Sequence, residues 1–109
     1  MGEWSDMRRK TYKLKTLENN RFSIMVTDLK HCYFCGKSPV DIHEVYGGAN
    51  RRVSMKNGFC VPLCRSCHQQ ITTNNTLSSL LKASCQRCFE INHTKEEFLQ
   101  LIGKYYDID

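Results

Sequence analysis

Apolar and polar residues alternate along residues 40–46, Val-Asp-Ile-His-Glu-Val-Tyr, in the pattern of a strand with one buried face. Residues 59–63, Phe-Cys-Val-Pro-Leu, form a second short apolar run. We interpret this run as a strand that returns beside the first, and Pro62 places it at a sheet edge or near its own end. A helix is expected from Cys64 to about residue 71. The predicted order is therefore strand, strand, helix.

The segment between the two strands, residues 49–57, is polar and basic, and we expect a loop that reaches into solvent. Asn57-Gly58 at its end is a turn signal. Ahead of the first strand, a helix over residues 7–20 is favoured only weakly, because its apolar residues are too sparse to form a stripe. Residues 22–26 read as a loop or a short strand.

Two amphipathic helices are predicted after the strand pair. Thr76 can cap the first helix, and its apolar residues recur at steps of three and four. Thr94 and Glu97 have the spacing of a capping box, which opens the second helix. The apolar face of the first helix comprises Leu77, Leu80, Leu81, Cys85, Cys88 and Phe89, and that of the second Phe98, Leu101, Ile102 and Tyr105.

Seven cysteines are many for a chain of 109 residues. No apolar run suits a signal peptide or a membrane span, so we expect a cytoplasmic protein, in which paired cysteines more often hold metal than each other. Two Cys-x-x-Cys pairs at this separation predict four thiolate ligands around one structural zinc ion. The four predicted ligands are Cys32, Cys35, Cys64 and Cys67.

The other cysteines and two histidines are not needed as zinc ligands. Cys85-x-x-Cys88 is a third pair, but both cysteines fall on the apolar face of a predicted helix, so core packing is favoured over metal binding. Cys60 lies in the returning strand and is expected to be buried. His31 adjoins the first cysteine pair and could substitute as a zinc ligand, although four cysteines make it unnecessary. His93 precedes a helix cap and is interpreted as structural.

Positive charge is clustered along the chain. Sixteen Lys and Arg against eleven Asp and Glu give a formal net charge of +5. Clustering suits a polyanionic partner such as nucleic acid, while an ordinary solvated face is the alternative for the first cluster. The clusters are Arg8, Arg9, Lys10, Lys13, Lys15 and Arg21 at the start, and Arg51, Arg52 and Lys56 between the cysteine pairs.

Further motifs accompany the cysteines. Residues 43–51 read His-Glu-Val-Tyr-Gly-Gly-Ala-Asn-Arg, residues 54–58 read Ser-Met-Lys-Asn-Gly, and His68 directly follows the last cysteine of the second pair. Residues 95–104 contain Lys-Glu-Glu-Phe and end in Ile-Gly-Lys. With these motifs the chain resembles the HNH endonuclease family, and more narrowly its small phage or prophage members, over about residues 20–106.

The resemblance implies an α+β fold with a zinc-stabilised ββα-metal core. A basic arm or helix over residues 1–21 would precede a single zinc domain over 22–109, with the two C-terminal helices as its cover. The implied function is a metal-dependent DNA endonuclease or nickase that hydrolyses phosphodiester bonds with Mg²⁺ or another divalent cation. The implied catalytic residues are His43, Glu44, Asn50 and His68, with His43 and His68 as ligands of the catalytic cation.

Two assignments stay open within the resemblance. In one alignment His43 is the cation ligand and Glu44 the general base. In the other His43 is the base, and Glu44 or Asp41 is the ligand. Successive strand residues face opposite ways, so His43 and Glu44 do not both point into one site without a bulge. Asn50 and Asn57 both fit the central asparagine of the family, and Asn50 is favoured.

The resemblance also implies that Arg51, Arg52 and Lys56 contact DNA phosphates. DNA is the expected partner, and a second copy of the chain or a phage or host protein is left open. An alternative function is a catalytically weak or inactive HNH-fold zinc protein that binds DNA or a protein. A zinc-binding regulator without nuclease ancestry fits the cysteines but leaves Asn50 and the two implied catalytic histidines unexplained.

Overall fold

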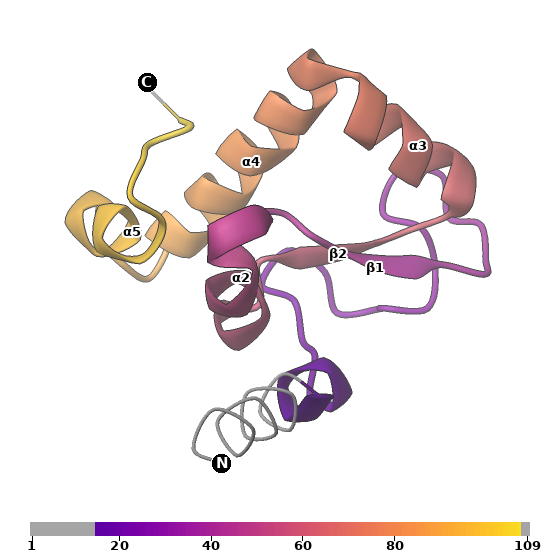
Figure 1. Ribbon diagram of the computed structural model, residues 1–109, viewed down its shortest axis with the longest axis horizontal. Coiled ribbons are helices and arrows are strands. Elements are labelled where there is room, and N and C mark those ends of the chain that lie inside the picture. Colours follow the sequence, from indigo (N-terminus) through magenta and orange to yellow (C-terminus); the bar gives the residue numbers. More distant parts are fainter. Residues whose placement is uncertain (1–14, 108–109) are drawn as a thin grey trace, which may run out of the picture.

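The computed structural model describes residues 15–107 as an α+β fold, in which helices surround a two-stranded antiparallel sheet (Figure 1). Residues 15–19 are helical, and most of the predicted basic arm lies outside the described residues. The elements that follow are β1 (Asp41–Glu44), the 3₁₀ helix η1 (Gly48–Asn50), α2 (Arg51–Asn57), β2 (Cys60–Leu63), α3 (Arg65–Thr73), α4 (Asn75–Glu90) and α5 (Lys95–Ile102).

The two strands pair antiparallel, with Asp41 opposite Leu63. Both are shorter than the runs predicted for them, residues 40–46 and 59–63, but they lie within those runs. Every residue of β2 is buried, whereas β1 begins with an exposed residue and continues half-buried. Because α3 follows β2 directly, the predicted order of strand, strand and helix is confirmed.

The prediction of a solvent-exposed loop over residues 49–57 is wrong, because this segment forms the end of η1 and then α2. The helix buries Ser54 and Met55. The Ser54 hydroxyl donates to the carbonyl of Tyr46 at 2.6 Å and accepts from the Tyr46 amide at 3.2 Å. These bonds satisfy backbone groups just beyond β1, so a tertiary contact stabilises a helix in a polar stretch. The predicted turn is present where Gly58 ends α2 with φ 75°.

The two C-terminal helices lie where predicted, with two corrections. Asn74, not Thr76, caps α4, since its side chain accepts from the Leu77 amide at 3.1 Å. Leu80 is 60% exposed, so its placement on the buried face is wrong, because the elements packed against α4 cover a narrower stripe than the sequence suggests. The capping box at Thr94 is confirmed in α5.

An aromatic core joins the sheet to the C-terminal helices. The ring of Phe59 packs edge-on against Tyr46 and Phe89, with centroid distances of 5.4 Å to each. Phe98 from α5 contacts the same group, and its ring lies 5.5 Å from that of Tyr46. Phe59 and Phe98 are fully buried. Residues so large and so buried contribute strongly to stability, so these contacts hold α4 and α5 against the hairpin.

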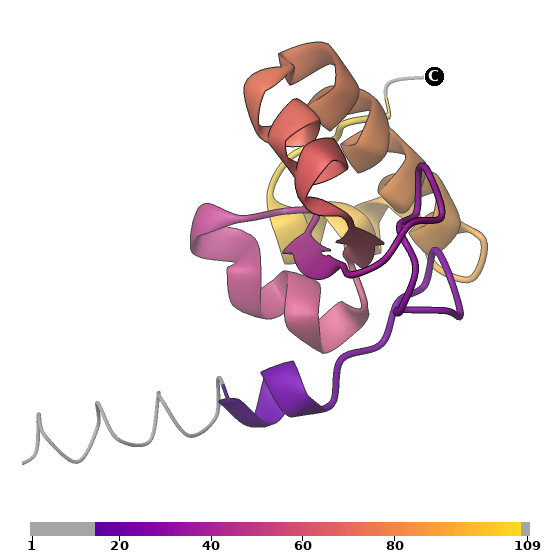
Figure 2. The same ribbon diagram turned by 90° about the vertical axis from the view of Figure 1, so that its right-hand side faces the viewer.

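The helices lie on both sides of the small sheet. α3 and α4 cover one side of the strands, and α2 lies on the other (Figures 1 and 2). Residues 22–26 form a loop that runs beside the end of α2, where the Ile24 amide donates to the carbonyl of Gly58 at 3.0 Å. Among the described residues, no helix combines the length and the apolar character needed to cross a membrane.

Candidate metal and catalytic site

The four predicted ligands come together although the two pairs are far apart in the chain. The sulfur atoms of Cys32, Cys35, Cys64 and Cys67 all lie within 4.8 Å of one another, and those of Cys35 and Cys64 are 3.5 Å apart. Four thiolates at about 2.3 Å from one zinc ion would be about 3.8 Å apart. The cluster therefore fits a metal such as zinc, and it is the one group of this kind found within residues 15–107.

Local backbone structure orients the cysteine cluster. Gly36 has φ 76° and donates its amide to the Cys32 carbonyl at 2.9 Å, which closes a tight turn after the first pair. Cys64 is the N-cap residue of α3. Burial opposes ionisation of Cys32, but hydrogen bonds from the backbone at Cys64, Cys35 and Phe34 outweigh it and lower the pKa of the thiol to about 6. Amides that stabilise a thiolate also favour binding of a metal cation.

The remaining cysteines and histidines are engaged elsewhere. Cys60 and Cys85 are fully buried, which confirms that both pack in the core, and Cys88 is partly buried. The His31 ring contacts the carboxylate of Asp28 at 2.7 Å, so it is not one of the clustered ligands. The His93 ring packs on Phe89 with a centroid distance of 4.2 Å. The burial of Cys60 and Cys85 and the packing of His93 agree with the structural roles expected for them.

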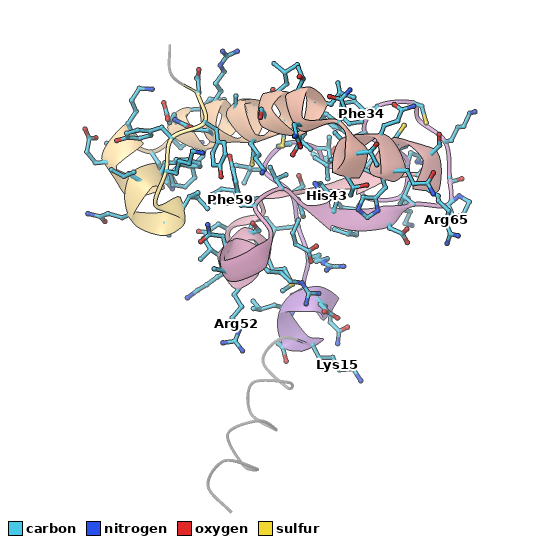
Figure 3. The ribbon with its side chains drawn as sticks, turned by 45° about the horizontal axis from the view of Figure 1, so that its top comes forward. Lys15, Phe34, His43, Arg52, Phe59 and Arg65 are labelled. Carbon is cyan, nitrogen blue, oxygen red and sulfur yellow. The ribbon has the colours of Figure 1, made fainter. Side chains whose placement is uncertain are left out.

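His43 and His68 face each other across the strand and the helix. The His43 side chain points from β1 toward α3 (Figure 3), and the centroids of the two rings are 5.2 Å apart with an interplanar angle of 65°. Burial and then the neighbouring His68 lower the pKa of His43 below its ordinary 6.5; nearby Lys82 acts in the same direction and Glu44 in the opposite one. His43 is therefore neutral at pH 7 and can accept a proton.

Glu44 lies on the opposite face of β1, as strand alternation requires. Its carboxylate forms ion pairs with Arg21 at 2.5 Å and with Arg51 at 3.5 Å. Two guanidinium groups therefore hold the carboxylate on the face of the strand away from His43. The geometry thus separates His43 and Glu44, which the sequence left as alternatives for the same role.

A polar hollow of about 270 Å³ adjoins His68. Asp41 lines it from β1, and Arg65 lines it from the first turn of α3. Sequence reasoning gave Arg65 no role, although it directly follows a cysteine and precedes His68 by three positions, which is one helical turn. Lys82 on α4, whose charge acts on His43, was missed as well, because only the packing of α4 over the hairpin brings it near.

The other predicted site residues are not gathered at this hollow. The Asn50 side chain donates to the carbonyl of Ile102 at 3.1 Å, so it fastens η1 to the end of α5. Asn57 donates to a carbonyl one turn earlier in α2. Arg52 and Lys56 are exposed on α2, across the sheet from α3, and Arg51 also pairs with an acidic residue of the N-terminal helix (Figures 1 and 3).

Comparisons of the chain with protein-family models, with curated proteins and with solved structures find no significant match.

Proposed function

We propose that this chain is an HNH-type DNA endonuclease or nickase that depends on a divalent cation and carries a structural zinc ion on its four clustered cysteines. The observation that carries the proposal is the placement of His43 on a strand and His68 on the following helix, with their rings 5.2 Å apart. Rigid elements hold both imidazoles beside the cysteine cluster. A paired strand and helix of this kind suits hydrolysis that needs a fixed base and a fixed ligand.

His43 is assigned as the general base, and His68 and Asp41 as the residues that would hold the cation. Asp41 and His43 are two positions apart on β1, so they share a strand face, and Asp41 lines the same hollow as His68. The Asp41 carboxylate suits Mg²⁺ or Mn²⁺, and the His68 imidazole suits Ni²⁺. When bound, such a cation neutralises charge on the scissile phosphate and on the leaving oxygen. Glu44 then positions the strand through its arginine partners.

Arg65 and Lys82 are the basic residues that we assign to the DNA backbone at this site. Arg65 lines the hollow with His68, and the charge of Lys82 acts on His43. The Arg65 guanidinium at the hollow would attract a phosphate and orient it toward His43, and the Lys82 charge near His43 would add to this attraction. Arg52 and Lys56 would contact a flanking part of the DNA, since α2 lies across the sheet.

Plasmid nicking with Mg²⁺, Mn²⁺ and Ni²⁺ tests the proposal. We expect the wild-type chain to convert supercoiled plasmid into the open-circle form, and His43→Ala or His68→Ala to reduce the rate by at least about a hundredfold. His93→Ala is the matched control, because its ring packs on Phe89 away from the hollow. Absence of cleavage with every cation, or equal loss in the control, would refute the enzyme assignment.

A catalytically weak or inactive zinc protein that binds DNA or a protein through the same fold is the second candidate. This candidate is favoured because few side chains are available to bind a catalytic cation. Within residues 15–107 the four cysteines are the one cluster of three or more potential metal ligands. On this alternative the wild-type chain binds duplex DNA, or a partner protein, and leaves plasmid intact with all three cations. The nicking experiment and a parallel gel-shift measurement separate the two candidates.

A further inference from the structure

Two aromatic side chains are exposed between the first pair of clustered cysteines. Tyr33 is 37% exposed and Phe34 is 49% exposed, although rings of this size are usually buried. The backbone beneath them is held in place, since the Tyr33 amide donates to the Pro62 carbonyl of β2 at 2.8 Å. We refer to Tyr33 and Phe34 as the aromatic turn. An exposed aromatic group on a rigid support indicates an interaction surface.

The arrangement of the two rings restricts what they can bind. Their centroids are 5.0 Å apart and their planes are inclined at 71°. Rings at this angle cannot clamp one flat ligand between them, but each can present a face or edge to a different planar group. The aromatic turn therefore fits a ligand with successive planar groups, such as the bases of a single strand.

A hollow of about 550 Å³ lies beside Tyr33. Its lining consists of residues 23–28 together with the first cysteine and the residues on either side of it. Asp28 and His31 in this lining are held by their mutual contact at 2.7 Å. A cavity that combines an aromatic wall with polar backbone and side-chain groups suits a nucleobase, which has flat faces and polar edges.

The charges around the aromatic turn indicate how a ligand is bound. Lys30, Lys37 and Asp28 are exposed within five residues of it along the chain, and the exposed Arg65 and Asp41 line the polar hollow at His68. Four thiolates around one zinc ion add a net charge of about −2. The surface is therefore close to neutral, so stacking rather than phosphate binding has to supply most of the affinity. Unpaired bases expose flat faces on which an aromatic ring can stack, whereas the bases inside a duplex are already stacked on one another.

We infer that the aromatic turn binds unpaired bases of single-stranded DNA. The turn is continuous with the polar hollow, because Phe34 precedes Cys35, the sulfur of Cys35 contacts that of Cys64 at 3.5 Å, and Arg65 follows Cys64. A strand whose phosphate lies at Arg65 can thus extend its next unpaired bases over Phe34. The inference rests on the proposed function for the choice of DNA as partner and for the phosphate at Arg65, and it does not require cleavage.

Binding of the zinc-loaded full chain to a fluorescein-labelled twelve-nucleotide strand, measured by fluorescence anisotropy, tests this inference. Phe34→Ala is expected to weaken binding about tenfold, with a shallow dependence on salt. Phe34→Leu keeps apolar area but lacks a ring, so it should weaken binding equally. Leu80→Ala removes an apolar side chain on α4 that is even more exposed than Phe34, and this variant should bind as wild type.

A second readout reports stacking directly. In a Trp4→Phe background, Phe34→Trp places a fluorophore at the surface, and its emission should be quenched by the single strand. Wild-type affinity in Phe34→Leu, or no quenching, would overturn the inference, and tighter binding of RNA of the same sequence would overturn the choice of DNA. His43→Ala is expected to keep strand binding, so loss of cleavage and loss of stacking are distinguishable.

Discussion

Arg21 and Glu44 form an ion pair that joins the segment before the first cysteine to β1. The guanidinium and carboxylate are 2.5 Å apart, and their side chains are only 21% and 15% exposed. The pair lies on the opposite face of the strand from His43, which faces α3. Glu44 thus anchors β1, whereas His43, the residue before it, faces His68.

Replacement of Glu44 by Ala should destabilise the fold. The change leaves a largely buried Arg21 without its carboxylate, and we expect the free energy of unfolding to fall by about 2 kcal/mol, below the about 3–5 kcal/mol of fully buried pairs. Urea denaturation measures the loss. The control is Glu18→Gln, which removes a more exposed partner of Arg51 and should cost under about 1 kcal/mol. Equal losses would contradict the anchoring role.

The cysteine cluster predicts metal content. Elemental analysis should find about one zinc ion per chain, and Cys35→Ser should abolish stoichiometric binding. Cys88→Ser is the matched control, because Cys88 lies on α4 outside the cluster. Removal of zinc by a chelator should lower the melting temperature, since the cluster joins the first cysteine turn to the start of α3. A folded wild-type chain without zinc would refute this prediction.

Burial should protect two cysteines from alkylation in the native state. Burial raises the pKa of the Cys60 thiol to about 11 and that of the Cys85 thiol to about 12. At pH 8 only about one in a thousand and one in ten thousand of these thiols would be ionised. Mass spectrometry after iodoacetamide treatment should show little labelling of either, and labelling should rise with pH and become rapid in urea. Rapid native labelling of Cys85 at pH 8 would contradict its place in the core.

Gly58 should tolerate substitution less well than Gly48. Both have positive φ, 75° and 59°, so Ala strains the backbone at either position. At Gly58 an added Cβ would also meet the Phe22 ring at 2.5 Å, whereas at Gly48 nothing lies within 4 Å. We expect about 1 kcal/mol for Gly48→Ala and roughly 2–3 kcal/mol for Gly58→Ala, measured by urea denaturation. Similar losses at both positions would contradict this prediction and show that the Phe22 ring moves aside at little cost in free energy.

Short-range patterns identified much of this fold because they encode local physics. The Thr94 capping box needs only two side chains three residues apart, and it is present at the start of α5. The cysteine pairs could be matched from their spacing alone, since two Cys-x-x-Cys turns at this separation are typical of a four-cysteine metal site. The strand pattern around His43 likewise placed β1, and alternation already required that His43 and Glu44 diverge.

Tertiary contacts decided what local patterns could not. The segment around Ser54 is too polar to predict as a helix. It forms α2 because the Ser54 hydroxyl hydrogen-bonds to the amide and the carbonyl of Tyr46. The arginine partners of Glu44 come from other parts of the chain, so its role could not be read from β1 alone.

The sequence by itself determined the four clustered cysteines, the strand–strand–helix order and the two covering helices, because spacing and periodicity act over a few residues. Only the tertiary structure decided on which side of the sheet the basic residues of each helix lie. It placed Arg65 beside His68 and left Arg52 on the far side. The physical reason is that the side of the sheet on which a helix packs depends on burial summed over the whole chain, which no local pattern records.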